Sequence, residues 1–461
     1  MKSILPILFA LLIATSVFAQ KEIKKPNFIL IVADDLGFGD LSFNGSKQIP
    51  TPNIDRLAHE GINFTQGYVS APVCSPSRAG LLTGRNQVSF GHDNNLGGNQ
   101  PGFDPQFLGL PLTETTIATR LHSLGYITGL IGKWHLGYES QFHPLKRGFD
   151  EFWGYTGGGH DYFEWKVDGK GYKSPIECNY KTPQQITYIT DDKGDECVDF
   201  VKRHKNEPFF LFASFNAPHA PMQATEADLE LFKNIKDKKR QKYCAMVYRL
   251  DVNVGRIMET VEKEGLAENT LIVFISDNGG PVDSNASINA PLNGQKGILY
   301  EGGIRVPFIM NWKGKLQAGK TYDNPVISLD FAATFFELAG GKITDDIKFD
   351  GVNLIPFTTG KTNVKPHESM NWRFTISSAI RDGNWKLISL PDRLPMLYNL
   401  ADDISEQHDV AMQNLDRTKL MLKTLGDWDV HLPHPVFLEG AVWKARQLHL
   451  YDVDYPLVQP E

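Results

Sequence analysis

The sequence predicts an α/β protein with a large, mainly parallel sheet sandwiched by helices, and a smaller C-terminal α+β subdomain that carries an antiparallel sheet. Three observations support this prediction. Short apolar runs alternate with helical stretches along most of the chain, which is the order of a βαβ fold. Each apolar run is followed at once by polar residues. After about Phe357 the pattern changes to short strand-like runs.

Four apolar runs are predicted strands, because each is long enough for a buried strand and too short for a helix. They span residues 28–33, 127–131, 209–215 and 271–276. Helical periodicity predicts a helix over 115–124, which stops at Gly125, a residue that favours helix C-terminal caps. A long amphipathic helix is predicted over 243–264.

The C-terminal region has its own pattern. Residues 360–363 have the composition of a linker, and Asp382-Gly383 separates two strand-like runs within residues 376–390. An Asp-Gly pair between such runs is a hairpin signal. We therefore predict a domain over residues 20–360 and a C-terminal subdomain over residues 361–461, both after an N-terminal segment, residues 1–19.

That N-terminal segment has the features of a signal peptide. Lys2 precedes a largely apolar run over residues 4–17, and Val17-Phe18-Ala19 ends in a small residue. A membrane anchor is the alternative, but the run is shorter than the roughly 20 residues that span a bilayer. We predict cleavage near Ala19 and export to the periplasm or the medium, with no membrane span.

Composition excludes some partners. The 461 residues are 41% hydrophobic and 22% charged, with a net charge of -7. No basic excess exists to neutralise phosphates, so nucleic acid is not an expected partner. Four cysteines are too few for a disulfide scaffold. Cys178 and Cys197 are the nearest pair that could form one bridge.

Polar groups follow the predicted strands at the point where each strand ends. Ligands of open α/β sheets bind beyond the carboxyl ends of the strands, so these groups are expected to meet in space. They are Asp34-Asp35, then Lys133 with His135, then His219, then Asp277-Asn278.

Cys74 is the centre of the most informative segment. Pro76 suits the first turn of a helix, with Ser75 as its cap. Cys74 then lies at a helix N-terminus, where backbone N–H groups favour an anion. A buried structural cysteine is the ordinary alternative.

Residues 74–78 (Cys-Ser-Pro-Ser-Arg) and 82–85 (Leu-Thr-Gly-Arg) resemble the signature of the type I sulfatases, of the alkaline phosphatase superfamily. Further matching motifs extend from about Lys25 to Trp312, and residues 397–400 with Glu406 match more weakly. The resemblance implies an alkaline-phosphatase-like fold and a sulfuric ester hydrolase. It also implies that a maturation enzyme oxidises Cys74 to formylglycine (3-oxoalanine), the catalytic aldehyde.

Four strand-end residues provide oxygen donors for a metal: Asp34, Asp35, Asp277 and Asn278. Hard cations such as Ca²⁺ prefer carboxylate and amide oxygens. Either pair alone is better explained by acidic residues in solvated loops or helix caps. Together they resemble the family's Ca²⁺ site, to which the aldehyde at position 74 also belongs, while Mg²⁺ remains open.

The resemblance also assigns roles to the basic residues. Arg78 and Lys133 would hold the aldehyde hydrate, and Lys133, His219 and Lys296 would bind the sulfate. His219 or Lys296 would protonate the leaving alcohol, and His135 would accept a proton as sulfate is expelled. Without the motifs around them, each is an ordinary loop or surface residue.

Substrate contacts are predicted in two loops and the C-terminal subdomain. Candidates are His92 in residues 91–95, His160 in residues 157–161, and Arg373 near Arg381. Four aromatic residues suit sugar stacking: Trp153, Tyr155, Tyr162 and Trp165. The expected substrate is a sulfated polysaccharide or oligosaccharide, with algal ulvan or carrageenan and animal glycosaminoglycans all open.

Two other function classes compete with a sulfatase. A phosphatase or phosphonate hydrolase of the same superfamily shares the strand-end metal placement, but a two-zinc enzyme needs more histidines than these oxygen donors provide. An inactive glycan-binding relative is disfavoured by the complete set of catalytic residue types.

Overall fold

The computed structural model describes residues 24–97, 102–164, 174–181, 185–438 and 440–456. The predicted signal peptide, residues 1–19, and Trp165 lie outside the described residues. Within the described ranges, no helix has both the length and the apolar character that crossing a bilayer requires.

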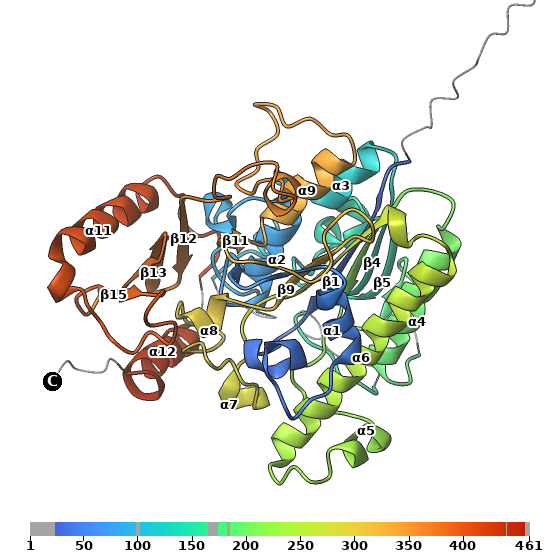
Figure 1. Ribbon diagram of the computed structural model, residues 1–461, viewed down its shortest axis with the longest axis horizontal. Coiled ribbons are helices and arrows are strands. Elements are labelled where there is room, and N and C mark those ends of the chain that lie inside the picture. Colours follow the sequence, from blue (N-terminus) through green and yellow to red (C-terminus); the bar gives the residue numbers. More distant parts are fainter. Residues whose placement is uncertain (1–23, 98–101, 165–173, 182–184, 439, 457–461) are drawn as a thin grey trace, which may run out of the picture.

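The large sheet lies at the centre of the molecule (Figure 1). Within the described residues it has nine strands, and five central neighbours run parallel: β8, β1, β7, β4 and β5. Across the sheet the order is β10 (Lys320–Tyr322), β2 (Ile62–Phe64), β9 (Phe308–Asn311), β8 (Thr270–Ser276), β1 (Asn27–Ala33), β7 (Phe209–Ser214), β4 (Ile127–Lys133), β5 (Glu151–Tyr155) and β6 (Glu177–Cys178).

Strand β1 is apolar throughout because helices cover both faces of the sheet. Ile29 and Ile31 pack into one core cluster, and Phe28 and Leu30 into the other, as the two-residue period of a strand requires. The helices of the first face are α1 (Pro52–His59), α4 (Ile189–Arg203) and α6 (Lys238–Lys263). Those of the second are α2 (Cys74–Thr83), α3 (Ile117–Ser123) and α9 (Asp330–Leu338).

The C-terminal subdomain is an antiparallel sheet flanked by helices, at one end of the molecule (Figure 1). Its strands are β12 (Ser369–Phe374), β13 (Ser377–Asp382), β14 (Trp385–Ser389) and β15 (Met396–Asn399), and its helices are α11 (Leu415–Asp429) and α12 (Ala441–His449). A third core cluster, which includes Val69, Leu299 and Trp372, packs the subdomain against the large domain.

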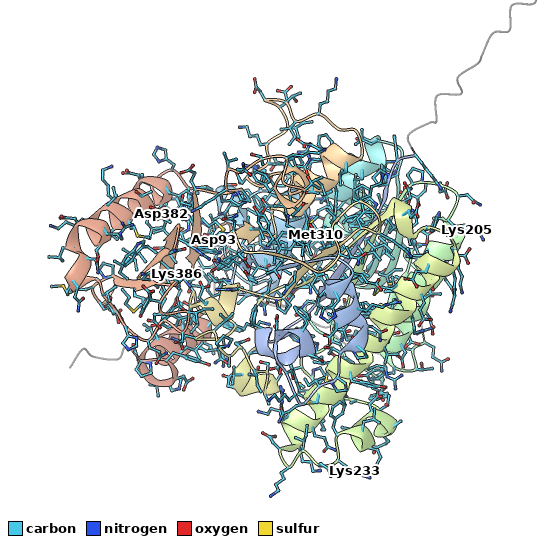
Figure 2. The ribbon with its side chains drawn as sticks, in the orientation of Figure 1. Asp93, Lys205, Lys233, Met310, Asp382 and Lys386 are labelled. Carbon is cyan, nitrogen blue, oxygen red and sulfur yellow. The ribbon has the colours of Figure 1, made fainter. Side chains whose placement is uncertain are left out.

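Short elements complete the fold. Strands β3 (Gly67–Tyr68) and β11 (Val326–Ile327) pair in parallel beside the large sheet. The short helices are α5 (Glu226–Leu231), α7 (Val282–Asn285), α8 (Glu301–Ile304) and α10 (Ile355–Thr358). Figure 2 shows Met310 at the centre of the molecule, whereas Lys205 and Lys233 extend from its surface.

The predicted fold class is confirmed, whereas the predicted cap of α2 and the predicted start of α6 are wrong. Helix α2 begins at Cys74 with Val73 as its cap residue, so Ser75 lies inside the helix and its hydroxyl contacts His92 instead. Cys178 and Cys197 are both free. The long helix α6 begins at Lys238, five residues before the predicted start. Asp237 caps it there. The domain boundaries remain predictions.

Candidate active site

The carboxyl ends of the parallel strands bring distant residues into one buried group, which we call the strand-end cluster. Strand β1 ends before Asp34 and Asp35, β4 ends at Lys133, and β8 ends before Asp277. The cluster consists of Asp34, Asp35, Cys74, Arg78, Lys133, His219, Asp277, Asn278 and Lys296. All nine are less than 9% exposed, as expected where a parallel sheet gathers its ligand.

Acidic groups of the cluster point toward one another. Ligand atoms of Asp34, Asp35, Cys74 and Asp277 all lie within 4.8 Å of one another. Burial and the Asp34 carboxylate raise the pKa of Asp277 to about 7, which is the effect of like charges held close together out of water. A bound cation would relieve this repulsion.

Asn278 supplies a further oxygen to the same place. Its amide nitrogen donates to Asp35 Oδ1 at 2.7 Å, so its Oδ1 is oriented away from that bond. Among the described residues, this buried Oδ1 has no hydrogen-bond partner. A buried polar atom without a partner is costly, and a hard cation accepts such oxygens as ligands. The predicted oxygen-donor set therefore fits a divalent metal.

Three basic side chains balance the carboxylates. Lys133 Nζ lies 2.5 Å from Asp34 Oδ2, and Lys296 Nζ lies 2.6 Å from Asp35 Oδ1. Arg78 Nε donates to Asp277 Oδ2 at 3.0 Å, and Arg78 Nη2 forms an ion pair with the same oxygen at 2.8 Å. Burial opposes ionisation of Asp34, but Lys133, His219 and Arg78 together hold the pKa of Asp34 well below its usual value.

Cys74 is the first residue of α2, and its side chain lies among these charged groups. Its Sγ is 3.4 Å from Asp34 Oδ1 and 3.1 Å from Lys296 Nζ. Burial and the Asp34 carboxylate raise the pKa of the Cys74 thiol far above its usual range. The thiolate is the nucleophilic form of cysteine, so the unmodified side chain is a poor nucleophile here.

The two histidines are held differently. His219 Nδ1 donates to the carbonyl oxygen of Ala220 at 2.6 Å, which leaves Nε2 facing Asp35 Oδ2 at 3.6 Å. His135 Nε2 donates to the carbonyl oxygen of Leu96 at 2.9 Å, which makes Nδ1 the acceptor of the neutral ring. Burial and Lys133 hold the pKa of His135 well below its usual value, so the ring is neutral.

Two residues of the site have unusual backbone conformations. Asp35 has φ of 68° and His135 has φ of 59°. Non-glycine residues rarely adopt this left-handed region, and such residues concentrate at functional sites. Asp35 follows the end of strand β1, and His135 follows the end of strand β4.

The predicted sugar contacts His92 and Arg373 lie outside the strand-end cluster. His92 Nε2 is 2.7 Å from Ser75 Oγ. Arg373 donates to Asp93 Oδ2 at 2.6 Å and Asp429 Oδ1 at 3.1 Å, and Figure 2 places Asp93 at the junction of the two domains. Both residues hold loops in place, and their contact with sugar stays a prediction.

His160 and the predicted stacking aromatics are buried. His160 Nδ1 donates to the carbonyl oxygen of Asp161 at 2.7 Å, and its ring packs against Tyr155. Trp153 is 7% exposed, and Tyr155 and Tyr162 are 0% exposed. The stacking prediction is therefore wrong for these three aromatics, whose rings pack inside the protein.

Three polar neighbours of the cluster escaped the sequence analysis, Ser214, Lys193 and Asn216, and Tyr162 was predicted in another role. Ser214 accepts from Arg78 Nη1 at 2.6 Å and donates to the Lys133 carbonyl at 2.6 Å. Lys193 Nζ donates to Asn216 Oδ1 at 2.6 Å, and Tyr162 OH donates to the carbonyl oxygens of Asn216 and His219, both at 2.8 Å. Ser214 ends strand β7, and that position could have singled it out. Lys193 lies mid-helix and gives no local signal.

Family models and curated relatives match most of this chain. The family model described as Sulfatase matches residues 26–341, and the model described as N-sulphoglucosamine sulphohydrolase, C-terminal matches residues 294–426. The uncharacterized sulfatase YdeN of Escherichia coli is 33% identical over 76% of this chain and 68% of its own length. Human N-acetylgalactosamine-6-sulfatase is 35% identical over 72% and 66%.

Solved structures extend the likeness to nearly the whole chain. Ps i-CgsB, crystallised in complex with k-i-k-neocarrahexaose, is 39% identical over 93% of this chain and 97% of that one, with a TM-score of 0.85. The PsFucS1 sulfatase from Pseudoalteromonas sp. is 25% identical over 88% and 90%, with a TM-score of 0.75. A phosphonate monoester hydrolase of Agrobacterium radiobacter, 19% identical with a TM-score of 0.61, shares the fold.

Proposed function

The chain belongs to the sulfatase family, and we propose that it hydrolyses sulfate esters of a sulfated carbohydrate with formylglycine at position 74 as the nucleophile. The position of Cys74 carries this proposal. Its Sγ lies between Asp34 and Lys296 at the start of a helix, yet the raised pKa of the thiol keeps it protonated. Conversion of Cys74 to an aldehyde would place a reactive, oxygen-bearing group between these charged side chains.

We propose calcium as the metal, with Mg²⁺ as the alternative. Asp34, Asp35, Asp277, Asn278 and the converted residue 74 would hold it, because carboxylate and amide oxygens are the ligands that Ca²⁺ prefers. The bound ion would offset negative charge on the sulfate and on the attacking oxygen. The conversion matters here too, since thiol sulfur is a poor ligand for a hard cation.

The basic residues would orient the aldehyde hydrate, offset charge on the sulfate and protonate the leaving group. Hydrated formylglycine supplies one hydroxyl that attacks sulfur and a second whose proton leaves when sulfate is released. Lys133 and Arg78, fixed by Asp34 and Asp277, would orient the hydrate. Lys296 and His219 would offset charge on the sulfate, and one of them would protonate the departing sugar oxygen.

His135 would complete the cycle. Its ring carries a proton on Nε2, so Nδ1 would accept the proton of the second hydroxyl. Loss of that proton returns the aldehyde and releases sulfate, so the active site is regenerated. A thiol at position 74 has no second hydroxyl and therefore cannot release sulfate by this route.

Mass spectrometry of the peptide that contains Cys74 tests the nucleophile directly. We expect the aldehyde in active enzyme produced together with a formylglycine-generating enzyme, and an unmodified thiol in inactive enzyme produced without it. Active enzyme whose residue 74 is entirely a thiol would contradict the proposal. Hydrolysis of an aryl phosphate in place of an aryl sulfate would instead support the phosphatase alternative.

For the substrate we propose a sulfated galactan of the carrageenan type, because the similar Ps i-CgsB was crystallised with a neocarrahexaose. Desulfation of a defined oligosaccharide panel tests this choice. Release of sulfate from carrageenan oligosaccharides is the expected result, and activity confined to ulvan or glycosaminoglycan oligosaccharides would contradict it. Export remains a further proposal, which N-terminal sequencing of the mature protein would test at Ala19.

A further inference from the structure

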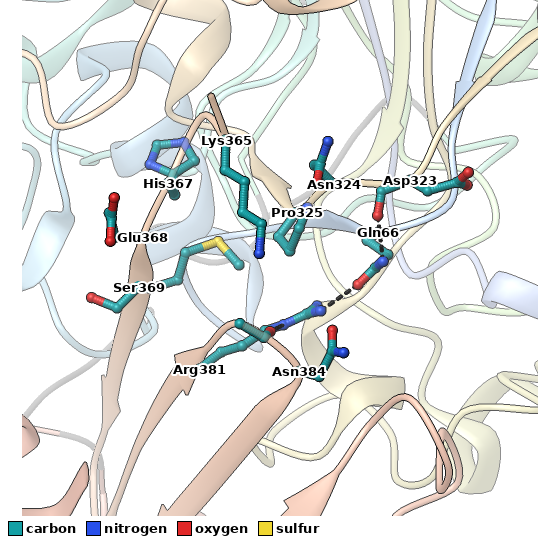
Figure 3. Close-up of a pocket in the computed structure, with 12 residues that line it drawn as sticks. Gln66, Asp323, Asn324, Pro325, Lys365, His367, Glu368, Ser369, Arg381 and Asn384 are labelled. Carbon is teal, nitrogen blue, oxygen red and sulfur yellow. Dashed lines mark hydrogen bonds between the residues drawn. The ribbon is translucent and has the colours of Figure 1, made fainter. Parts of the chain in front are cut away.

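A second group of buried charges lies at the junction of the two domains, and we call it the interdomain cluster. Its members are Tyr68, Glu301, Arg305, Arg381, Lys386 and Glu406, none of them more than 7% exposed. The first three belong to the large domain, and the last three come from β13, β14 and the segment after β15. Figure 3 shows the pocket beside this cluster, where Arg381 bonds to Gln66 across the junction.

Opposite charges alternate within the cluster. Lys386 Nζ lies 2.9 Å from Glu301 Oε1 and 2.9 Å from Glu406 Oε1. Tyr68 OH donates to Glu301 Oε2 at 2.5 Å, and Arg305 Nη1 lies 3.3 Å from the same oxygen. Buried charges are stable when each faces a partner, so Glu301 is held from both domains at once.

Glu406 also binds the backbone of the large domain. Its Oε2 accepts the amide hydrogen of Glu301 at 2.6 Å. Glu301 is the first residue of α8, and the first N–H groups of a helix lack partners within the helix. The C-terminal subdomain therefore caps α8 with a side chain from another domain.

Helix α8 in turn supports the turn that carries Lys296. Gly302 N donates to the carbonyl of Asn293 at 2.6 Å, on the other side of that turn. A Cβ on Gly303 would lie 2.0 Å from the carbonyl oxygen of Ile298, so helix and turn are in direct backbone contact. A displacement of α8 would therefore also displace Lys296.

The same backbone reaches the two other parts of the active site. Gly279 N, next to Asn278, donates to the carbonyl of Gly303 at 3.0 Å, and Gly297 N donates to the carbonyl of Pro72 at 2.9 Å, two residues before Cys74. Helix α8 thus contacts both the Lys296 turn and the oxygen-donor loop, and the Lys296 turn contacts the segment before α2.

We propose that Glu406 and Lys386 are positioning residues, through which the C-terminal subdomain holds Lys296 against the reacting sulfate. This inference rests on the proposed function, in which Lys296 offsets charge on that sulfate. It assigns the subdomain a part in catalysis although none of these side chains touches the strand-end cluster. The path runs from Glu406 and Lys386 to Glu301, then through α8 to the Lys296 turn.

The first test compares Glu406→Ala with Glu406→Gln. Alanine removes the acceptor for the Glu301 amide, whereas glutamine keeps an oxygen in its place. We expect Glu406→Ala to lower kcat by roughly tenfold, because small displacements of catalytic groups are costly, and Glu406→Gln to retain most of the activity. Equal losses in the two variants would overturn the proposed role of this hydrogen bond.

A second experiment tests whether Glu406→Ala lowers kcat by displacing Lys296. In a Lys296→Ala background, Glu406→Ala should cause no further loss of kcat, because the group that it positions is gone. The same loss in both backgrounds would overturn the inference while leaving the proposed sulfatase function intact. Tyr68→Phe, which removes one donor to Glu301, offers a milder variant for the same cycle if Glu406→Ala does not fold.

Asp330→Ala is the matched control. Asp330 is another buried carboxylate that joins the domains, since it accepts from the amides of Ile327 and Val352 and pairs with His367 at 2.8 Å. It should lower the melting temperature without lowering kcat. Hydrogen exchange of residues 293–304 gives a readout independent of activity: it should accelerate in Glu406→Ala and not in Asp330→Ala, and unchanged exchange in both would contradict the proposal.

Discussion

The strand-end cluster and the interdomain cluster are both groups of buried charge, but their charges are arranged in opposite ways. In the strand-end cluster, ligand atoms of Asp34, Asp35 and Asp277 lie within 4.8 Å of one another. In the interdomain cluster, Lys386 lies between two carboxylates at 2.9 Å from each. Convergence of like charges leaves a centre that favours a bound cation, whereas alternation stabilises a joint by itself.

The largest expected difference between the clusters is in catalysis. Cys74→Ala should reduce sulfate release by at least about 10³-fold, because it removes the nucleophile. Its melting temperature should fall only slightly, because alanine fits in place of the 1% exposed cysteine and leaves only a small cavity. Sulfate release and thermal unfolding, measured on the same preparation, check both halves of this expectation.

Cys244→Ala is the control for that variant, because Cys244 is an equally buried cysteine in the core face of α6. It should lower stability through the small cavity that it leaves and keep normal kcat. Substantial activity of Cys74→Ala on any sulfate ester would show that the strand-end cluster does not act through this residue.

The second largest expected difference is the response to metal removal, which should act on the strand-end cluster. A chelator should inactivate the enzyme and lower its stability, because the strand-end carboxylates then repel one another without a cation. The stability lost is about 3 kcal/mol if the ion had been present at roughly 100 times its Kd. Thermal unfolding with EDTA, then with added Ca²⁺ or Mg²⁺, checks this and identifies the ion.

Asn278→Ala sharpens the metal experiment. The variant loses the one oxygen donor whose Oδ1 lacks a hydrogen-bond partner among the described residues, so it should need a higher Ca²⁺ concentration for the same stabilisation. Glu406→Gln, in the other cluster, should respond to Ca²⁺ as the wild type does. A wild-type melting temperature indifferent to both EDTA and Ca²⁺ would argue against a metal in the strand-end cluster.

The smallest expected effect is a pH dependence from the interdomain cluster. Burial and the neighbouring Glu301 raise the pKa of Glu406 from 4.5 to about 7, although Lys386 opposes the rise. Between these values the folded protein holds a proton that the unfolded chain has released. The free energy of unfolding therefore falls as pH rises through this window, by at most about 1.4 kcal/mol per pH unit from this group.

Glu406→Gln removes that titration. Denaturant unfolding at several pH values should show the wild type losing stability relative to the variant between pH 4.5 and about 7, with little relative change below pH 4.5. A constant difference across this range would mean that Glu406 has the same pKa in the folded and unfolded chain.

Much of the site follows from local pattern. Apolar runs and the residues directly after them located Asp34, Lys133 and Asp277, because a parallel sheet aligns its strand ends wherever they fall in the chain. Local pattern failed where side chains serve packing. The sequence predicted sugar stacking for Trp153 and Tyr162, but Trp153 lies within strand β5 and both rings are buried. Burial depends on what the rest of the chain places over them.

The sequence by itself determined the sheet, the cysteine at a helix start and the oxygen donors at the strand ends, because periodicity and short motifs are properties of neighbouring residues. The tertiary structure alone decided how the C-terminal subdomain pairs its buried charges with the large domain. Glu301 is 85 residues from Lys386 and 105 from Glu406, and no local pattern marks partners so far apart. Their pairing depends on two domains docking so that each buried charge meets an opposite one.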